Sequence, residues 1–255
     1  MPVNADQTTI SASENEGGLP INELFYSIQG EGKLAGMPSV FVRTSGCNLR
    51  CWFCDSYHTS WEPTHAWMTV DDIIEEVTNH EQSDHVVVTG GEPMIHDEIE
   101  PLIERLADAG YHVTVESNGT VYRDLPINLA SISPKLVSST PTADRDPKGE
   151  GEWADRHEQR RIDIDTLAKL VDAYDSQIKF VVTGPEDMPE INDLIEEIRS
   201  ADTQIPDSDV LLMPEGMTAE RLAETREPTA QLAMEHGYQY TPRLHVNLWE
   251  DAPGR

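Results

Sequence analysis

The amino-acid sequence predicts an α/β protein, an incomplete (β/α) barrel of about six parallel strands, and three observations support this. From Ser39 onward, short apolar runs of strand length alternate with amphipathic helical windows, which is typical of parallel strands joined by crossover helices. The chain has 255 residues, enough for one large domain with a sizeable core. About six to seven strand-like runs occur, fewer than the eight strands of a closed barrel.

The elements follow in order along the chain. Thr69 can cap a helix over 70–80, because its hydroxyl precedes an apolar face at helical spacing with acids in the first turn. The run 85–89 is apolar and β-branched and ends at Gly90, which predicts a buried strand. The alternation then continues with predicted helices at 97–109, 164–174, 190–200 and 218–235, strands at 111–116, 129–133, 178–183 and 210–213, and a last extended piece at 244–249.

The composition is strongly acidic. Acidic residues number 47 against 18 basic ones, a formal net charge of -29, and a field of that sign repels phosphate backbones and anionic bilayers. We therefore expect no direct binding to nucleic acid or to membranes. The acids are spread along the whole chain, and Lys is scarce. This pattern is typical of a protein from a halophilic host, where concentrated salt screens the self-repulsion.

The domain organisation predicted from the sequence is simple. Residues 1–20 are polar and acidic, without the basic start and apolar middle of a signal peptide, so we expect a flexible leader on a cytoplasmic protein. Residues 21–255 are expected to form one domain. Within it, 137–161 is polar and rich in Pro and Gly, which favours a solvated surface insertion over a lid. His245, in the tail, could face the site, but we interpret it as a core or surface histidine.

The three cysteines, Cys47, Cys51 and Cys54, lie within eight positions in a Cys-x3-Cys-x2-Cys arrangement. Three thiolates on one tight loop can hold three corners of an iron–sulfur cube and leave the fourth iron open to a small molecule. His58 offers a different interpretation, because Cys-x3-Cys-x2-Cys-x3-His could close a structural zinc site. Three buried structural thiols are a weaker alternative. Spacing alone leaves the iron–sulfur and zinc interpretations open.

The context of the cysteines carries a resemblance. The stretch 41–56 reads FVRTSGCNLRCWFCDS, and one strand later comes Thr89-Gly90-Gly91-Glu92-Pro93. Together these motifs resemble the radical S-adenosylmethionine enzymes. The resemblance implies a [4Fe-4S] cluster on the three cysteines, with S-adenosylmethionine on the open iron and its methionyl amine at the Gly-Gly-Glu-Pro turn. Glycines let the backbone approach the ligand, and a carboxylate there attracts the amine.

A second motif narrows the resemblance. Upstream lies 25–32, FYSIQGEG, and with Arg43 and Cys54-Asp55-Ser56 it resembles the 7-carboxy-7-deazaguanine synthase family, over most of the chain from Ile21 to Trp249. An amide and a carboxylate at Gln29 and Glu31 can read the donor and acceptor edge of a pterin, and Arg43 suits a substrate carboxylate. The residues assigned to substrate are Ile28, Gln29, Gly30, Glu31, Arg43 and Thr89.

The resemblance also implies a set of cofactor residues. Several of them follow predicted strands, where the active sites of barrel enzymes assemble, and Phe53 would lie against the adenine. Ser56 would bind Mg2+ through its hydroxyl, although Thr is the commoner residue there. The residues expected to contact the cofactor are Phe53, Asp55, Gly91, Glu92, Ser117, Asn118, Ser133, Lys135 and Glu215.

The activity that the resemblance implies is a radical lyase reaction. In it, 6-carboxy-5,6,7,8-tetrahydropterin becomes 7-carboxy-7-deazaguanine with loss of ammonia, on the route to queuosine or archaeosine in transfer RNA. The cofactors carry the bond-breaking chemistry, so no side chain is expected to act as a strong base. An external electron donor such as flavodoxin or ferredoxin and a homodimer are expected from the family. A glycyl-radical activase is the nearest alternative, but it has no use for a pocket of Gln29, Glu31 and Arg43.

Overall fold

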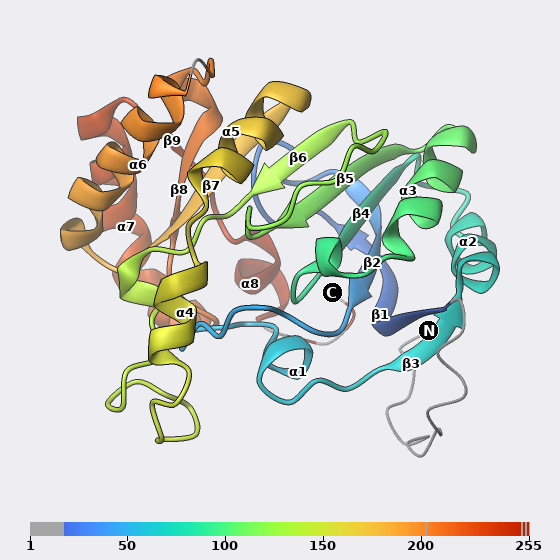
Figure 1. Cartoon of the computed structure of the whole chain (residues 1–255), viewed down its shortest axis with the longest axis horizontal. Coiled ribbons are helices and arrows are strands. Elements are labelled where there is room, and N and C mark those ends of the chain that lie inside the picture. Colours follow the sequence, from blue (N-terminus) through green and yellow to red (C-terminus); the bar gives the residue numbers. More distant parts are fainter. Residues whose placement is uncertain (1–17, 202, 251, 253, 255) are drawn as a thin grey trace.

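The computed structural model describes residues 18–201, 203–250, 252 and 254, and its strands alternate with helices along most of the chain (Figure 1). The strands are β1 (Gly18–Ile28), β2 (Pro38–Thr44), β3 (Ala66–Thr69), β4 (His85–Gly90), β5 (His112–Ser117), β6 (Leu129–Ile132), β7 (Ser176–Val182), β8 (Val210–Pro214) and β9 (Gln239–Tyr240). The helices are α1 (Tyr57–Ser60), α2 (Val70–Thr78), α3 (Ile99–Asp108), α4 (Ala154–Arg160), α5 (Ile164–Ala173), α6 (Met188–Ser200), α7 (Ala219–His236) and α8 (Leu244–Trp249). Single 3₁₀ turns lie at Pro93–Ile95 (η1), Val137–Ser139 (η2), Pro185–Asp187 (η3) and Asp207–Asp209 (η4).

Among the described residues, the strands form a single sheet in the order β3-β1-β2-β4-β5-β6-β7-β8-β9. From β2 to β9 every neighbouring pair is parallel. The sheet ends at β3 on one side and β9 on the other, so it does not close on itself. The predicted α/β class with a mostly parallel, incomplete barrel is confirmed.

The antiparallel end of the sheet corrects the predicted leader. Strand β1 pairs antiparallel with both β2 and β3, and its first residues pair with Thr69, Met68 and Trp67. Leu19 has no exposed surface, and burying an aliphatic side chain stabilises the fold by about 1.5–3 kcal/mol. Residues Gly18–Pro20 are therefore part of the sheet and not of a leader; positions 1–17 lie outside the described residues.

The sheet has two differently used faces. On the outer face, α2 and α3 pack on β1, β2, β4 and β5 in one apolar cluster, and α5 and α6 pack on β6, β7 and β8 in another. On the other face lies a small cluster of Phe25, Phe41 and Val87, in which the two Phe rings stack at 4.9 Å. This second face carries the cavity described below, so the helices support the site from behind.

Two local predictions have opposite outcomes. Thr69 caps α2 as expected, in a capping box in which its hydroxyl accepts from the Asp72 amide. The extended piece predicted at 244–249 is wrong, because these residues form helix α8. Its apolar pattern is too short to separate strand from helix. The structure decides for a helix, since the Leu244 amide donates to the Gly30 carbonyl at 2.8 Å and Val246 is buried.

Most of the segment 137–161 is exposed, as expected for a surface insertion, but its two ends are anchored to the rest of the protein. It contains η2 and α4, and the side chains of Ser139 and His157 have no exposed surface. Its polar side chains pack because they hydrogen-bond one another: a His157 ring nitrogen lies 2.9 Å from the Ser139 hydroxyl. Within the part of the chain that the structure describes, no helix is both long and apolar enough to cross a bilayer.

Candidate active site

A cavity of about 590 Å³ opens at the carboxyl ends of the parallel strands. Its lining comes from the ends of β4, β5, β7 and β8, from the cysteine loop, from the turn after β1 and from the segment around α8. Every residue predicted to bind substrate, cofactor or metal lines this cavity, with the exception of Glu92. The structure thus brings residues far apart in the sequence to one space, as expected for the carboxyl edge of a barrel.

One end of the cavity holds the cysteine loop. Cys47, Cys51 and Cys54 all line it as free thiols. The Leu49 amide donates to Cys47 Sγ at 3.4 Å, and the Ser60 hydroxyl donates to Cys54 Sγ at 3.1 Å. Burial raises the pKa of all three thiols, that of Cys47 to about 12. Iron must therefore displace their protons on binding.

The donor set fits an iron–sulfur cube. Among the described residues, no three side chains of His, Cys, Asp or Glu converge on a point suited to a single metal ion. An iron–sulfur cube does not need ligands that converge on one ion. It needs three soft thiolates, each of which binds a different iron of the cluster. The three thiols on one cavity wall supply that arrangement.

The Gly-Gly-Glu-Pro turn is pressed against the start of the cysteine loop. A Cβ at Gly91 would lie 2.2 Å from the Gly46 carbonyl oxygen, and Gly90 has φ +150°. Only glycine permits this approach without moving the backbone. The Glu92 amide donates to that same Gly46 carbonyl at 2.9 Å. The two motifs are therefore joined before any ligand binds.

The contact of the Glu92 carboxylate with the cofactor stays a prediction, and in this structure the carboxylate bonds within the protein. It has no exposed surface and lies behind the cavity lining. Its oxygens accept hydrogen bonds from the Met94 amide, the Ser117 hydroxyl at 3.0 Å and the Asn118 amide at 2.6 Å. Burial raises the pKa of Glu92 to about 7 despite these donors. In this structure Glu92 fixes the end of β5 relative to the turn.

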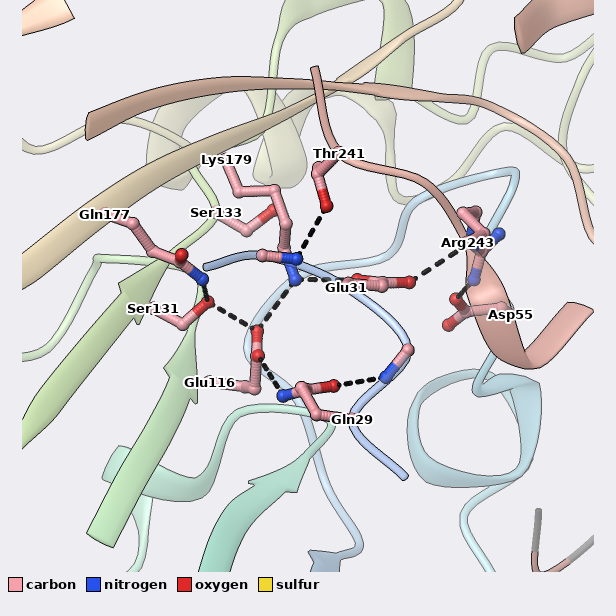
Figure 2. Close-up of polar contacts among 12 residues, drawn as sticks. Gln29, Glu31, Asp55, Glu116, Ser131, Ser133, Gln177, Lys179, Thr241 and Arg243 are labelled. Carbon is pink, nitrogen blue, oxygen red and sulfur yellow. Dashed lines mark hydrogen bonds and ion pairs between the residues drawn. The ribbon is translucent and has the colours of Figure 1, made fainter. Parts of the chain in front are cut away.

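The opposite end of the cavity is an ion-pair network (Figure 2). Lys179 Nζ lies 2.6 Å from Glu31 Oε2 and 3.0 Å from Glu116 Oε2. Arg243 Nε lies 3.1 Å from Glu31 Oε1, and its guanidinium also bonds to Asp55. Burial alone would raise the pKa of Glu31, but Lys179 and Arg243 hold it well below its usual range. Glu31 is therefore an ionised acceptor at any pH near neutrality.

Gln29 is oriented by the same network. Its Nε2 donates to Glu116 Oε1 at 3.2 Å, and its Oε1 accepts from the Gly30 amide at 2.8 Å. Gly30 itself touches α8, since a Cβ there would lie 1.9 Å from His245 Nδ1. His245 lines the cavity, so the interpretation of this residue as a core or surface histidine is wrong.

Arg43 lies between the two ends. Its Nε donates to Glu23 at 3.1 Å, and its Nη1 donates to the Ser56 hydroxyl at 2.8 Å. That hydroxyl donates in turn to Asp55 Oδ1 at 3.2 Å. The side chains of Arg43, Asp55 and Ser56 thus form a chain that links the cysteine loop to the Glu31 network.

The remaining predicted cofactor residues hold one another in place. Lys135 Nζ donates to the Ser133 hydroxyl at 2.6 Å, and Glu215 accepts from Arg221 Nε at 2.8 Å. Asn118 Nδ2 donates to Asn48 Oδ1 at 2.8 Å, which ties the end of β5 to the cysteine loop. These contacts arrange polar groups along the wall between the two ends of the cavity.

The sequence analysis missed several cavity residues. Lys179 and Arg243 were not predicted, His245 was considered for the site but interpreted as a core or surface histidine, and Glu116 was noted only as part of a segment. Lys179 carried a usable signal, because a lysine in the middle of an apolar strand of a Lys-poor chain must find a partner. Arg243 carried none, since nothing local distinguishes it from a surface arginine.

The segment 137–161 packs against the outside of the cysteine loop. The Arg50 amide donates to His157 Nδ1 at 3.2 Å, and the Trp52 indole Nε1 donates to the Ser138 carbonyl at 2.7 Å. Because His157 Nδ1 accepts a hydrogen bond from the Arg50 amide and the Ser139 hydroxyl donates to the Leu136 carbonyl, His157 Nε2 carries the ring proton and donates to Ser139. Burial lowers the pKa of His157 to about 4, in agreement with a neutral ring.

Comparison with known proteins gives consistent results. Residues 41–139 match the family model described as the radical SAM superfamily. A 7-carboxy-7-deazaguanine synthase of Halobacterium salinarum is 68% identical over 99% of both chains, and one of Rhodopirellula baltica is 40% identical over 97% of this chain and 93% of its own. The crystal structure of QueE from Escherichia coli, 23% identical, superposes with a TM-score of 0.59 over 89% of this chain and 95% of that one, which shows the shared fold.

Proposed function

The chain belongs to the 7-carboxy-7-deazaguanine synthase family of the radical S-adenosylmethionine superfamily, and from that membership we propose how its cavity serves the reaction. The enzyme acts in deazapurine biosynthesis on a small pterin. Membership excludes both the zinc-stapled module and the glycyl-radical activase. The observation that carries the proposal is that Gln29, Glu31 and Arg43 share one cavity with the three cysteine thiols.

The proposed substrate is 6-carboxy-5,6,7,8-tetrahydropterin, and the product is 7-carboxy-7-deazaguanine. Cys47, Cys51 and Cys54 would hold the [4Fe-4S] cluster beside S-adenosylmethionine, and together these cofactors would supply radical hydrogen-abstraction chemistry directed at C6 of the pterin. The chain's own residues place C6 and exclude water. Because the cofactors carry the bond-breaking chemistry, we assign no side chain as a catalytic base.

Glu31 would accept the N–H donors of the pterin's pyrimidine edge. An ionised carboxylate has about four lone-pair sites, and Lys179 and Arg243 use one direction on each oxygen of Glu31. Positions for substrate donors therefore remain. Gln29, held by Glu116 and its neighbouring amide, would add a fixed amide. Arg43 would bind the substrate carboxylate through its guanidinium.

We also assign Mg2+ to Ser56 and the adjacent Asp55. Hydroxyl and carboxylate oxygens are the ligands that Mg2+ takes, usually together with waters and substrate oxygens, and the two groups lie 3.2 Å apart. The Ser56 hydroxyl also accepts from Arg43, and its second lone pair remains for the metal. Arg43 would thus lie beside the metal while it binds the substrate carboxylate.

The test is anaerobic incubation of the reconstituted enzyme with the tetrahydropterin, S-adenosylmethionine, Mg2+ and a chemical reductant. We expect a deazapurine product, together with about four irons per chain. Glu31→Ala should reduce pterin turnover far more than it reduces S-adenosylmethionine binding. Accumulation of 5'-deoxyadenosine without deazapurine would contradict the substrate, and equal losses of turnover and cofactor binding would contradict the role of Glu31. A cytoplasmic homodimer supplied by an external electron donor remains a prediction from the family.

A further inference from the structure

Unpaired cations are unevenly distributed in this acid-rich protein. With 47 acidic residues for 18 basic ones, most described cations lie within 4.0 Å of a carboxylate. Among the described residues, the cations without a carboxylate partner are Arg50, Lys135, Arg145, Arg156, Arg160, Lys169 and Arg226. Apart from Lys169 and Arg226, all of these lie in the cysteine loop or in 135–160.

Aromatic faces hold several of these guanidinium groups instead. Arg50 and Arg156 lie over the ring of Trp153, with Cζ-to-centroid distances of 4.3 and 4.8 Å, and Arg145 lies 5.7 Å from the ring of Trp52. Arg160 follows Arg156 by four residues on α4, on the same side of the helix. We call Arg50, Trp52, Arg145, Trp153, Arg156 and Arg160 the arginine–tryptophan patch.

Acidic residues near the patch do not form ion pairs with its arginines. Asp144, Glu152 and Asp155 are exposed in the same segment, yet none forms an ion pair with the patch within 4.0 Å. Stacking on indole keeps a guanidinium charged without a carboxylate partner. The patch therefore offers donors to a partner without first breaking an internal salt bridge.

The patch lies behind the cysteine loop. Trp52 follows Cys51 directly in the chain, and Arg50 Nη1 donates to the Cys47 carbonyl at 2.7 Å. No member of the patch is among the described residues that line the cavity. In Figure 1, α4 and the loop before it lie beside the blue cysteine loop, below the sheet. The thiols thus face the cavity on one side of the loop, and the patch occupies the other side.

We propose that the arginine–tryptophan patch is the docking surface for an acidic one-electron carrier protein. The inference rests on the proposed function, because the reaction requires an electron to reach the cluster held by Cys47, Cys51 and Cys54. A carrier docked here gives one electron to the cluster and is oxidised by one electron, with no proton transferred. It reaches the cluster from behind, so the pterin and S-adenosylmethionine keep their opening.

The chemistry of the patch selects the partner. The three exposed guanidinium groups, those of Arg145, Arg156 and Arg160, can bind carboxylates in bidentate pairs. Two indoles add apolar contact area, and arginine and tryptophan are both enriched at interaction surfaces. The composition predicts a host rich in salt, where the Debye length at 1 M is about 3 Å. Long-range attraction is screened there, so only pairs in direct contact contribute. A surface of stacked arginines and tryptophans satisfies that condition.

The experiment compares two charge reversals that change the net charge equally. Arg156→Glu/Arg160→Glu alters the patch. The control, Lys169→Glu/Arg226→Glu, alters two exposed cations outside the patch that have no carboxylate partner among the described residues. Stopped-flow absorbance follows reduction of the cluster by a reduced low-pI [2Fe-2S] ferredoxin, and separately by photoreduced deazaflavin, a small uncharged reductant. Calorimetric titration with the oxidised ferredoxin measures binding without turnover. Arg145→Glu serves as an independent variant of the patch.

We expect the patch variants to be reduced by ferredoxin at least about tenfold more slowly and to bind it correspondingly more weakly. Their reduction by deazaflavin should match that of the unaltered protein, and the control should change less than about twofold in every measurement. An unchanged ferredoxin rate, an equal loss in the control, or an equal loss with deazaflavin would overturn the proposal. Deazapurine formation driven by deazaflavin tests the proposed function separately, since it bypasses the patch.

Discussion

Lys179 Nζ lies 2.6 Å from Glu31 Oε2, and this contact joins the middle of β7 to the turn after β1 across 148 positions of the chain. The lysine also bonds to Glu116, so one buried cation serves two carboxylates. Together with Arg243 it keeps Glu31 ionised inside the protein. The substrate end of the cavity therefore has its acceptors charged and fixed before substrate arrives.

We expect Lys179→Met to lower the free energy of unfolding by about 3 kcal/mol, because it leaves the mostly buried Glu116 carboxylate without a cation and Glu31 with Arg243 alone. The pKa of Glu31 should rise, and pterin turnover should fall with it. Urea unfolding and steady-state kinetics measure both effects. The matched control is Lys148→Met, whose ion pair with Glu62 is exposed and spans 3.7 Å and should contribute about 0–1 kcal/mol. Similar losses in the two variants would show that Lys179 does not hold the network.

Gly30→Ala should disturb the substrate end of the cavity, because the new Cβ would lie 1.9 Å from His245 Nδ1. We expect the KM for the pterin to rise by about tenfold, which corresponds to 1.4 kcal/mol, while S-adenosylmethionine binding changes little. The double variant Gly30→Ala/His245→Ala removes the clash, so its KM should fall below that of Gly30→Ala. If the double variant is no better than the single one, the contact between Gly30 and His245 is not the cause.

Ser56→Ala should raise the Mg2+ concentration needed for half-maximal turnover, because the variant lacks the hydroxyl assigned to the metal. Ser56→Thr keeps the hydroxyl and is the matched control. Titration of Mg2+ into both variants, with iron content measured in parallel, separates the metal site from the cluster. An unchanged Mg2+ requirement in Ser56→Ala would show that the metal binds elsewhere.

His157 makes the stability of the metal-free protein depend on pH. Its folded-state pKa of about 4 lies below the ordinary value of 6.5, so the unfolded chain binds more protons between these values. His157 therefore contributes fully above pH 6.5 and destabilises the fold progressively as the pH falls toward 4, by about 3 kcal/mol in total. His157→Asn keeps an acceptor for the Arg50 amide and does not titrate.

The measurement is the difference in the free energy of unfolding between the unaltered protein and His157→Asn, from urea titrations at several pH values. As the pH falls from 6.5 to 4, the unaltered protein should lose more free energy of unfolding than His157→Asn does. A constant difference over this range would show that His157 is not buried as a neutral ring. His236→Asn, at the exposed last turn of α7, controls for the loss of a histidine elsewhere.

Much of the candidate site could be predicted because its signals are contiguous. The three cysteines, the Gly-Gly-Glu-Pro turn and the Gln29–Glu31 motif each depend on spacing within a few residues, which tertiary structure cannot alter. Thr69 and its helix are local in the same way, since the cap and its acceptor amide are three residues apart. The alternation of strands and helices also fixes the fold class, because each amphipathic segment must bury its apolar face.

What remained was decided by contacts between distant segments. The helix at 244–249, the pairing of Gly18–Pro20 with β3 and the burial of Ser139 and His157 all depend on partners elsewhere in the chain. The charges of Lys179, Arg243 and Glu31 gain their meaning only where β7, α8 and the turn after β1 meet. A side chain's sequence neighbours determine its local conformation, but the packing of the sheet determines which charges it meets, and those charges set its ionisation and its role.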